Sequence, residues 1–133
     1  MDKITKTIYI LAPREKVWDT MLNKETYDQW ASAFHEGSTY EGRWAKGSKI
    51  RFVGPNEDGT IGGIVSMVVD NQLHSFISTQ PVGLIKGDEE DATSPEAQQW
   101  LGGFENYTFT DKDGGTELKI EVDVPADFKP TMD

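Results

Sequence analysis

The stretch from Thr116 to Val124 constrains the fold more than any other part of the chain. Its apolar residues occupy alternate positions: Leu118, Ile120, Val122 and Val124. Charged residues fill the positions between them, and this period of two predicts a strand with one face in a core and the other in water. Tyr107 and Phe109, followed by the turn 111–115, predict the other arm of a β-hairpin. We therefore expect an antiparallel sheet whose apolar face is covered by other elements.

Length and composition predict one soluble domain over residues 1–133. The chain has 133 residues, 36% of them hydrophobic and 11% aromatic, and no apolar run approaches the ~20 residues that a membrane span requires. The N-terminal residues contain no apolar signal-peptide segment, so we expect a cytoplasmic location and no membrane partner. The formal net charge of −10 opposes contact with phosphate backbones, so we expect no nucleic-acid partner.

Alternating and helical apolar patterns predict the remaining elements. Further strands are expected over residues 3–11, 38–44, 48–53, 60–69 and 73–80. Helices are expected over 13–22 and 24–30, with another turn or two after the capping residue Ser94. Residues 70–72 are expected to form a turn. The adjacent glycines Gly62 and Gly63 are expected to form a bulge or to allow a close approach of two backbones. Seven strands with segregated helices predict an α+β fold.

Several motifs, in this order along the chain, carry a resemblance to a known family: Ala12–Trp18, Trp44–Phe52, the strand around Gly63, Glu105–Phe109 and Gly114–Leu118. The chain resembles the START-like (SRPBCC) superfamily, and within it the homologues of the activator of the heat-shock protein 90 ATPase. The resemblance implies a helix-grip fold, in which a curved seven-stranded antiparallel sheet wraps around a long C-terminal helix. Two short helices follow the first strand of such proteins, and a cavity holds apolar ligands in many of them.

The C-terminal end departs from that family pattern. After Pro125 the chain continues only through residues 126–133, which are too few for the long helix. We expect either that this helix is missing from the chain or that a partner chain supplies the cover. An uncovered apolar sheet face favours pairing between copies, so both a monomer and a homodimer stay open.

The sequence contains no recognisable catalytic or metal-binding motif. Cysteine is absent, which excludes disulfides, thiol nucleophiles and thiolate metal ligands. His35 and His74 are interpreted as a linking residue in solvent and a turn residue, and Arg43 and Arg51 as surface residues. The acidic run 88–91 lacks the alternating spacing of a calcium loop and is interpreted as a solvated loop. No catalytic residue, metal or cofactor is therefore predicted.

Aromatic side chains are the remaining candidates for a binding site. Most are expected in the core, because aromatic residues dominate burial in a domain of this size. A subset is predicted to line an apolar pocket: Trp30, Phe34, Tyr40, Phe52, Phe76, Trp100 and Tyr107.

The leading hypothesis is a non-enzymatic protein that binds a small hydrophobic molecule, whose identity the sequence does not specify. One alternative is a regulator associated with a chaperone ATPase that acts by protein–protein contact. Another is a cyclase- or hydrolase-like enzyme in which a histidine, tyrosine or carboxylate of the cavity performs acid–base chemistry.

Overall fold

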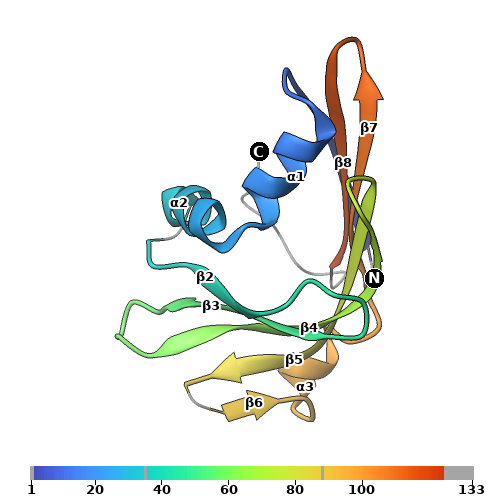
Figure 1. The fold of residues 1–133 in the computed structure, drawn as a ribbon. Coiled ribbons are helices and arrows are strands. Elements are labelled where there is room, and N and C mark those ends of the chain that lie inside the picture. Colours follow the sequence, from blue (N-terminus) through green and yellow to red (C-terminus); the bar gives the residue numbers. More distant parts are fainter. Residues whose placement is uncertain (1, 35, 88, 125–133) are drawn as a thin grey trace.

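The computed structural model describes residues 2–34, 36–87 and 89–124 and consists of one strongly curved sheet with three helices in that part of the chain (Figure 1). The strands are β1 (Asp2–Ile10), β2 (Thr39–Gly42), β3 (Lys49–Pro55), β4 (Ile61–Gln72), β5 (Phe76–Lys86), β6 (Glu89–Asp91), β7 (Glu105–Lys112) and β8 (Gly115–Val124). The helices are α1 (Arg14–Leu22), α2 (Lys24–Phe34) and α3 (Pro95–Gln98). The expected α+β helix-grip fold is confirmed.

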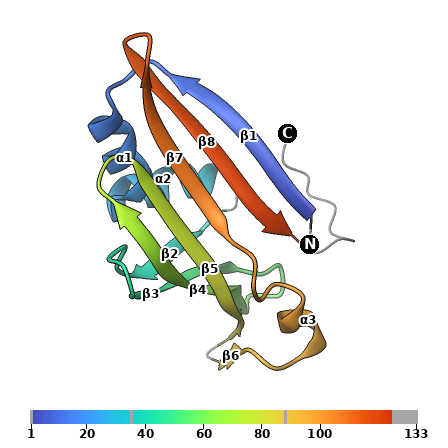
Figure 2. The same cartoon turned by 90° about the vertical axis from the view of Figure 1, so that its right-hand side faces the viewer.

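The sheet is antiparallel throughout and runs in the order β1-β8-β7-β5-β4-β3-β2, with β6 paired to the far end of β5. It bends between the upright strands β1, β8 and β7 and the strands β4, β3 and β2, which cross below the helices (Figures 1 and 2). Two register shifts between β4 and β5 lie at this bend. Bulges of this kind increase the local twist and let a sheet curve.

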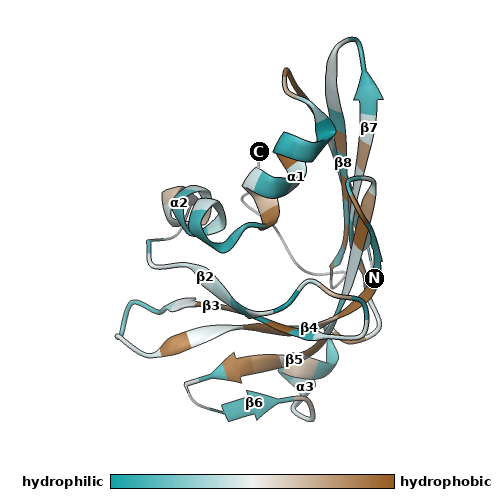
Figure 3. Cartoon of the chain, viewed as in Figure 1, coloured by the Kyte–Doolittle hydropathy of each residue, from teal (hydrophilic) through white to brown (hydrophobic). Residues whose placement is uncertain are grey.

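Strand register fixes which residues line the inner, concave face. Leu118 pairs with Phe109, and Ile120 pairs with Tyr107, which in turn pairs with Ile77 of β5. Because directly paired residues point to the same side, the apolar half of the Thr116–Val124 pattern lies on one face of the sheet. Hydrophobic segments are visible along β4, β5 and β8 (Figure 3).

Helices α1 and α2 cover one end of the concave face. The buried core that they share with the sheet contains Val17, Trp18, Leu22, Tyr40, Ile50, Val68, Ile77, Phe109 and Leu118. Asn23 ends α1 and caps α2, because its side-chain oxygen accepts a hydrogen bond from the Glu25 amide at 3.1 Å. The buried Tyr40 hydroxyl donates to the Leu22 carbonyl at 2.6 Å and so ties β2 to the end of α1.

Two sequence expectations about loops were wrong. Residues 70–72 were expected to turn, but they complete β4, and the turn lies at Leu73–Ser75 instead. The side-chain amide of Asn71 donates a hydrogen bond to the Trp44 carbonyl at 2.7 Å. This contact stabilises Asn71 within a strand, although asparagine normally favours turns. The acidic run was expected to be a loop, but Glu89–Asp91 forms β6 against β5. Its place is stabilised by ion pairs described below.

Gly63 confirms the expected close approach of two backbones. It has a φ of +152°, and a Cβ atom at this position would overlap the carbonyl oxygen of Phe52 on β3. The absent side chain therefore lets β3 and β4 stay in register where the sheet bends.

Replacing Gly63 by Ala should lower the free energy of unfolding by at least about 2 kcal/mol, since the methyl group forces the β3 backbone to move. Urea unfolding of purified variants measures this. Gly59→Ala is the matched control, because Gly59 also has a positive φ, +86°, but no atom lies within 4 Å of its Cβ position. A loss no larger than that of the control would show that β3 and β4 do not need the close approach.

The long-helix expectation falls on residues 125–133, which lie outside the described part of the chain. Among the described helices, none has the length and hydrophobicity needed to cross a membrane.

Candidate functional site

A chain of aromatic rings joins α2 to the concave face. The ring of Tyr27 lies 4.9 Å from that of Tyr40, Tyr40 lies 5.4 Å from Trp44, and Trp44 lies 5.7 Å from Phe52. Tyr40 is buried, whereas Tyr27, Trp44 and Phe52 are only partly buried against the core. The indole Nε1 of Trp44 is buried and makes no hydrogen bond within the described residues. The cluster therefore has partly exposed apolar surface and one buried polar atom without a hydrogen-bond partner in the described part of the fold.

Glu105 places a carboxyl group on the same face, beside these rings. It opens β7 and pairs with Thr79 of β5 on one side and Val122 of β8 on the other. The Tyr107 hydroxyl, two residues along the same face of β7, donates a hydrogen bond to a Glu105 carboxylate oxygen. Burial raises the pKa of Glu105 from 4.5 to about 7, because desolvation disfavours the charged form.

Tyr27 links the carboxyl group to the aromatic cluster. Its pKa is raised to about 12, first by burial and next by the negative charge of Glu105. The charge of the Glu105 carboxylate on β7 therefore acts on the hydroxyl group of Tyr27 on α2. The hydroxyl of Thr79, which is 1% exposed, has no hydrogen-bond partner within the described residues. No described Lys or Arg forms an ion pair with Glu105.

These residues form what we call the concave-face site: Tyr27, Trp44, Phe52, Thr79, Glu105 and Tyr107. Its apolar residues are aromatic, and its polar groups are few. A carboxyl group that titrates near neutral pH can accept or donate hydrogen bonds there. This combination is typical of sites for small organic molecules.

The structure brings only part of the predicted pocket together. Tyr40, Phe52 and Tyr107 all lie on the concave face, although Tyr40 belongs to the buried core. Trp30 lies at the rim, where 36% of its surface is exposed and its ring is 4.7 Å from that of Tyr27.

The structure does not bring the other three predicted residues to this site. Phe76 pairs with Thr108 and so faces away from the side occupied by Tyr107. Trp100 follows α3, which packs on β5 rather than on α1 or α2. The Phe34 side chain lies outside the described part of the structure. Roles in ligand binding for the seven residues stay predictions.

Sequence reasoning missed Tyr27, Trp44, Thr79 and Glu105 as site residues. A signal for Glu105 was present, because Glu105, Tyr107 and Phe109 occupy alternate positions of one strand and so share a face. Nothing in the sequence shows that Thr79 is its cross-strand neighbour, since that pairing joins segments far apart in the chain.

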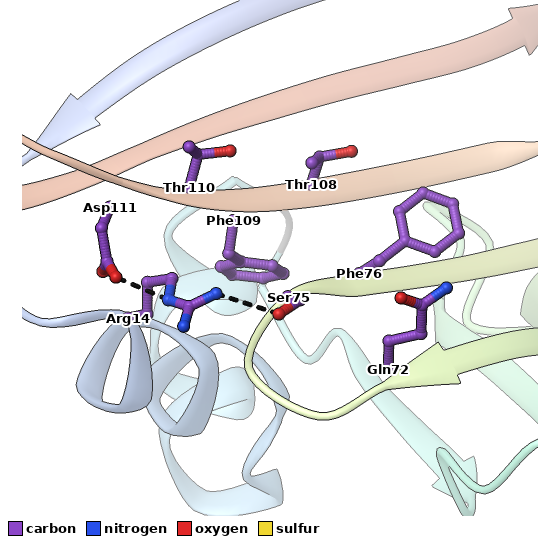
Figure 4. A pocket seen from close by; sticks show the side chains of 8 residues that line it. All are labelled: Arg14, Gln72, Ser75, Phe76, Thr108, Phe109, Thr110 and Asp111. Atoms are coloured by element: carbon purple, nitrogen blue, oxygen red, sulfur yellow. Dashed lines mark hydrogen bonds and ion pairs between the residues drawn. The ribbon is translucent and has the colours of Figure 1, made fainter.

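An open hollow of about 650 Å³ lies outside the concave-face site, where α1 meets the β4–β5 and β7–β8 hairpins (Figure 4). Arg14 spans it: Nε lies 3.1 Å from the Asp111 carboxylate, and Nη1 donates to the Ser75 hydroxyl at 2.9 Å. Phe76 is the one predicted site residue among its lining residues. Because the Arg14 guanidinium already contacts both Asp111 and Ser75, we interpret it as a structural residue that connects α1 to the two hairpins.

The remaining charged candidates make surface ion pairs. Arg51 contacts Glu41 at 2.7 Å and Glu90 at 3.1 Å, in agreement with its expected surface position. Lys49 also contacts Glu90, at 2.7 Å, so the acidic strand β6 is held by basic residues rather than solvated as a loop. Among the described residues, no cluster of three or more His, Cys, Asp or Glu side chains is placed to hold a metal ion.

The structure describes one of the two histidines. His74 lies in the β4–β5 turn with a φ of +64°, and its ring packs edge-on at 6.0 Å from that of Trp18. This agrees with its interpretation as a turn residue. His35 falls outside the described residues.

The curved antiparallel sheet with two short helices over its inner face defines a START-like protein of the helix-grip class. The family model "Activator of Hsp90 ATPase homolog 1-like protein" matches residues 11–130, so the chain belongs to this family. No curated protein has a significant sequence match to the chain.

Solved structures share the fold at low sequence identity. An uncharacterized protein from Rhizobium leguminosarum is 15% identical, with a TM-score of 0.69 over 91% of this chain and 74% of its own. A protein from Mycobacterium smegmatis is 16% identical, with a TM-score of 0.66 over 90% of this chain and 70% of its own. The Aha1 protein from Colwellia psychrerythraea, described as a dimer, is 18% identical, with a TM-score of 0.63 over 100% of this chain and 81% of its own.

Proposed function

We propose that this protein binds a small, mainly apolar molecule at the concave-face site, between the sheet and α2. The observation that carries the proposal is the combination of partly buried aromatic walls with buried polar atoms that have no partner in the described structure. A core built only for stability pairs its buried polar atoms, because each unpaired one costs about 1–3 kcal/mol. A bound molecule would supply the missing contacts.

The geometry of the cover supports the same proposal. Helix α1 packs on β7 and β8, and α2 packs on β2 at the opposite edge of the sheet, so the two helices together cover part of the concave side (Figure 1). Ile4 and Val122 continue the cross-strand row of Thr79 and Glu105 toward the β1 edge and are only partly buried. Apolar surface of this kind gains about 25 cal/mol per Å² when a ligand removes it from water.

Contact with another protein is a second candidate function. The family description refers to activation of a chaperone ATPase, and the Colwellia relative is described as a dimer. An unchanged chaperone ATPase rate on titration with this protein, together with a monomeric mass by light scattering, would reject this candidate.

Native mass spectrometry of gently purified protein tests ligand binding directly. We expect a fraction of the protein to carry an additional mass of a few hundred daltons, which organic extraction removes. Phe52→Ala should lower that fraction, because the variant removes an aromatic wall. Leu73→Ala is the matched control, since Leu73 is 68% exposed in the β4–β5 turn. Protein without any bound mass, and without uptake of the probes named below, would contradict the proposal.

A further inference from the structure

The concave-face site contains an acid without a basic partner. Lys6 is the closest candidate by register, since it pairs with Ile120 and so shares this face. It is exposed, however, and forms no ion pair with Glu105 in the described structure. Tyr107 already donates its hydroxyl proton to the carboxylate, and Tyr27 stands beside it as a phenol that stays neutral at physiological pH. An ionised Glu105 therefore lacks a positive charge that the site itself could provide.

The groups around Glu105 suit a cation better than an anion. The faces of tyrosine, tryptophan and phenylalanine rings attract positive charge, and Tyr27, Trp44 and Phe52 form the wall of this site. The unpaired Thr79 hydroxyl can accept a hydrogen bond, as can the carboxylate beside it. A carboxylic acid ligand would meet like charge here, in a protein whose net charge is −10.

We propose that the ligand is an apolar amine, whose protonated nitrogen donates hydrogen bonds to the Glu105 carboxylate and the Thr79 hydroxyl while its hydrocarbon part lies against the aromatic wall. This inference rests on the proposed function and specifies the chemistry of its ligand. The amine supplies the positive charge that no described Lys or Arg places against Glu105, since Lys24 lies over the Tyr40 ring and pairs with Asp28, and the ring faces stabilise the same charge. An alcohol of equal length fills the same apolar space but contributes no charge.

Octylamine and 1-octanol form a matched pair of probes for this inference. We expect octylamine to bind at least about tenfold more tightly than 1-octanol, because a charge-assisted hydrogen bond in a desolvated site is about twice as strong as a neutral one. Isothermal titration calorimetry, with tryptophan fluorescence as a second readout, measures both affinities at pH 8.

Two variants that change the net charge by the same amount distinguish the effect of the Glu105 carboxylate from the effect of the protein's overall negative charge. Glu105→Gln should reduce octylamine affinity about tenfold or more and leave 1-octanol affinity unchanged, because the amide keeps a hydrogen-bonding side chain but no charge. Glu57→Gln, in the exposed β3–β4 turn, should change neither affinity. An equal loss of octylamine affinity in both variants would assign the effect to net charge and overturn the inference.

The pH dependence gives an independent readout. Octylamine affinity should rise between pH 6 and pH 8, as Glu105 loses its proton, whereas 1-octanol affinity should stay flat. Of the groups around Glu105, Tyr27 stays an uncharged phenol over that range, because burial raises its pKa to about 12. Tyr107 donates its hydroxyl to the carboxylate, and Lys6 is the basic residue of β1 that shares this face.

The outcomes distinguish the two proposals. Equal affinity for both probes, without dependence on Glu105, would reject the amine and leave apolar ligand binding standing. No binding of either probe, together with no copurified mass, would reject both.

Discussion

Replacing Glu105 by Gln should raise the free energy of unfolding at pH 8 by about 3–3.5 kcal/mol, from the ~1.4 kcal/mol that each unit of pKa difference represents. In the folded protein the pKa of Glu105 is about 7, whereas in the unfolded chain it is near 4.5. The folded state therefore holds a proton that the unfolded state has already lost, so stability falls as pH rises from about 4.5 to about 7. The amide cannot ionise and escapes this loss.

Urea unfolding of both proteins at pH 4.5, 6, 7 and 8 measures the effect. The difference between variant and wild type should be close to zero at pH 4.5, increase through pH 6 and level off above pH 7. Glu57→Gln should show no such curve, because its side chain lies in an exposed turn. A pH-independent difference for Glu105→Gln would mean that the carboxyl group is solvated in the folded protein.

Phe109→Ala should lower the free energy of unfolding by about 3–5 kcal/mol, the usual cost of removing a buried aromatic ring. Phe109 is 2% exposed, and its ring centroid lies 5.1 Å from that of Trp18 on α1. It therefore fills the junction through which α1 packs on β7. Because the whole stability of a domain this size is about 5–15 kcal/mol, the variant should be close to unfolding at room temperature.

Circular dichroism during thermal unfolding tests this prediction. Phe104→Ala is the control, since Phe104 precedes β7 and is 40% exposed, so its truncation should cost below about 1 kcal/mol. Similar losses in the two variants would show that the α1–β7 junction does not depend on the Phe109 ring.

Glu105→Gln should have opposite effects on the stability of the empty protein and on the affinity for the proposed ligand. In the empty protein the carboxylate is a destabilising group, and its removal should strengthen the fold. With an amine bound, the same carboxylate gains a counter-charge, so its removal should weaken the complex. A single substitution that stabilises the empty protein and weakens ligand binding is the expected signature of a group retained for function rather than for folding.

The regular parts of the fold could be predicted because they follow from local periodicity. The alternation in Thr116–Val124 correctly places β8, the helical pattern correctly places the start of α2, and the capping residue Ser94 that of α3. The two errors have a common cause. Residues 70–72 and 89–91 carry polar residues that normally favour loops, but tertiary contacts hold them in strands: Asn71 through the Trp44 carbonyl, and Glu90 through Lys49 and Arg51.

Local sequence patterns predict most of the sheet, the helices and the face on which Glu105 lies, because side-chain direction in a strand depends only on alternation along that strand. The neighbours of Glu105 on that face depend on the tertiary structure. Thr79 on β5 becomes the cross-strand neighbour of Glu105, and Tyr27 on α2 comes under the influence of its charge, only through strand pairing and the packing of the helix. Whether a buried charge has a partner depends on residues distant in sequence, and for that reason local patterns identified the fold but not the concave-face site.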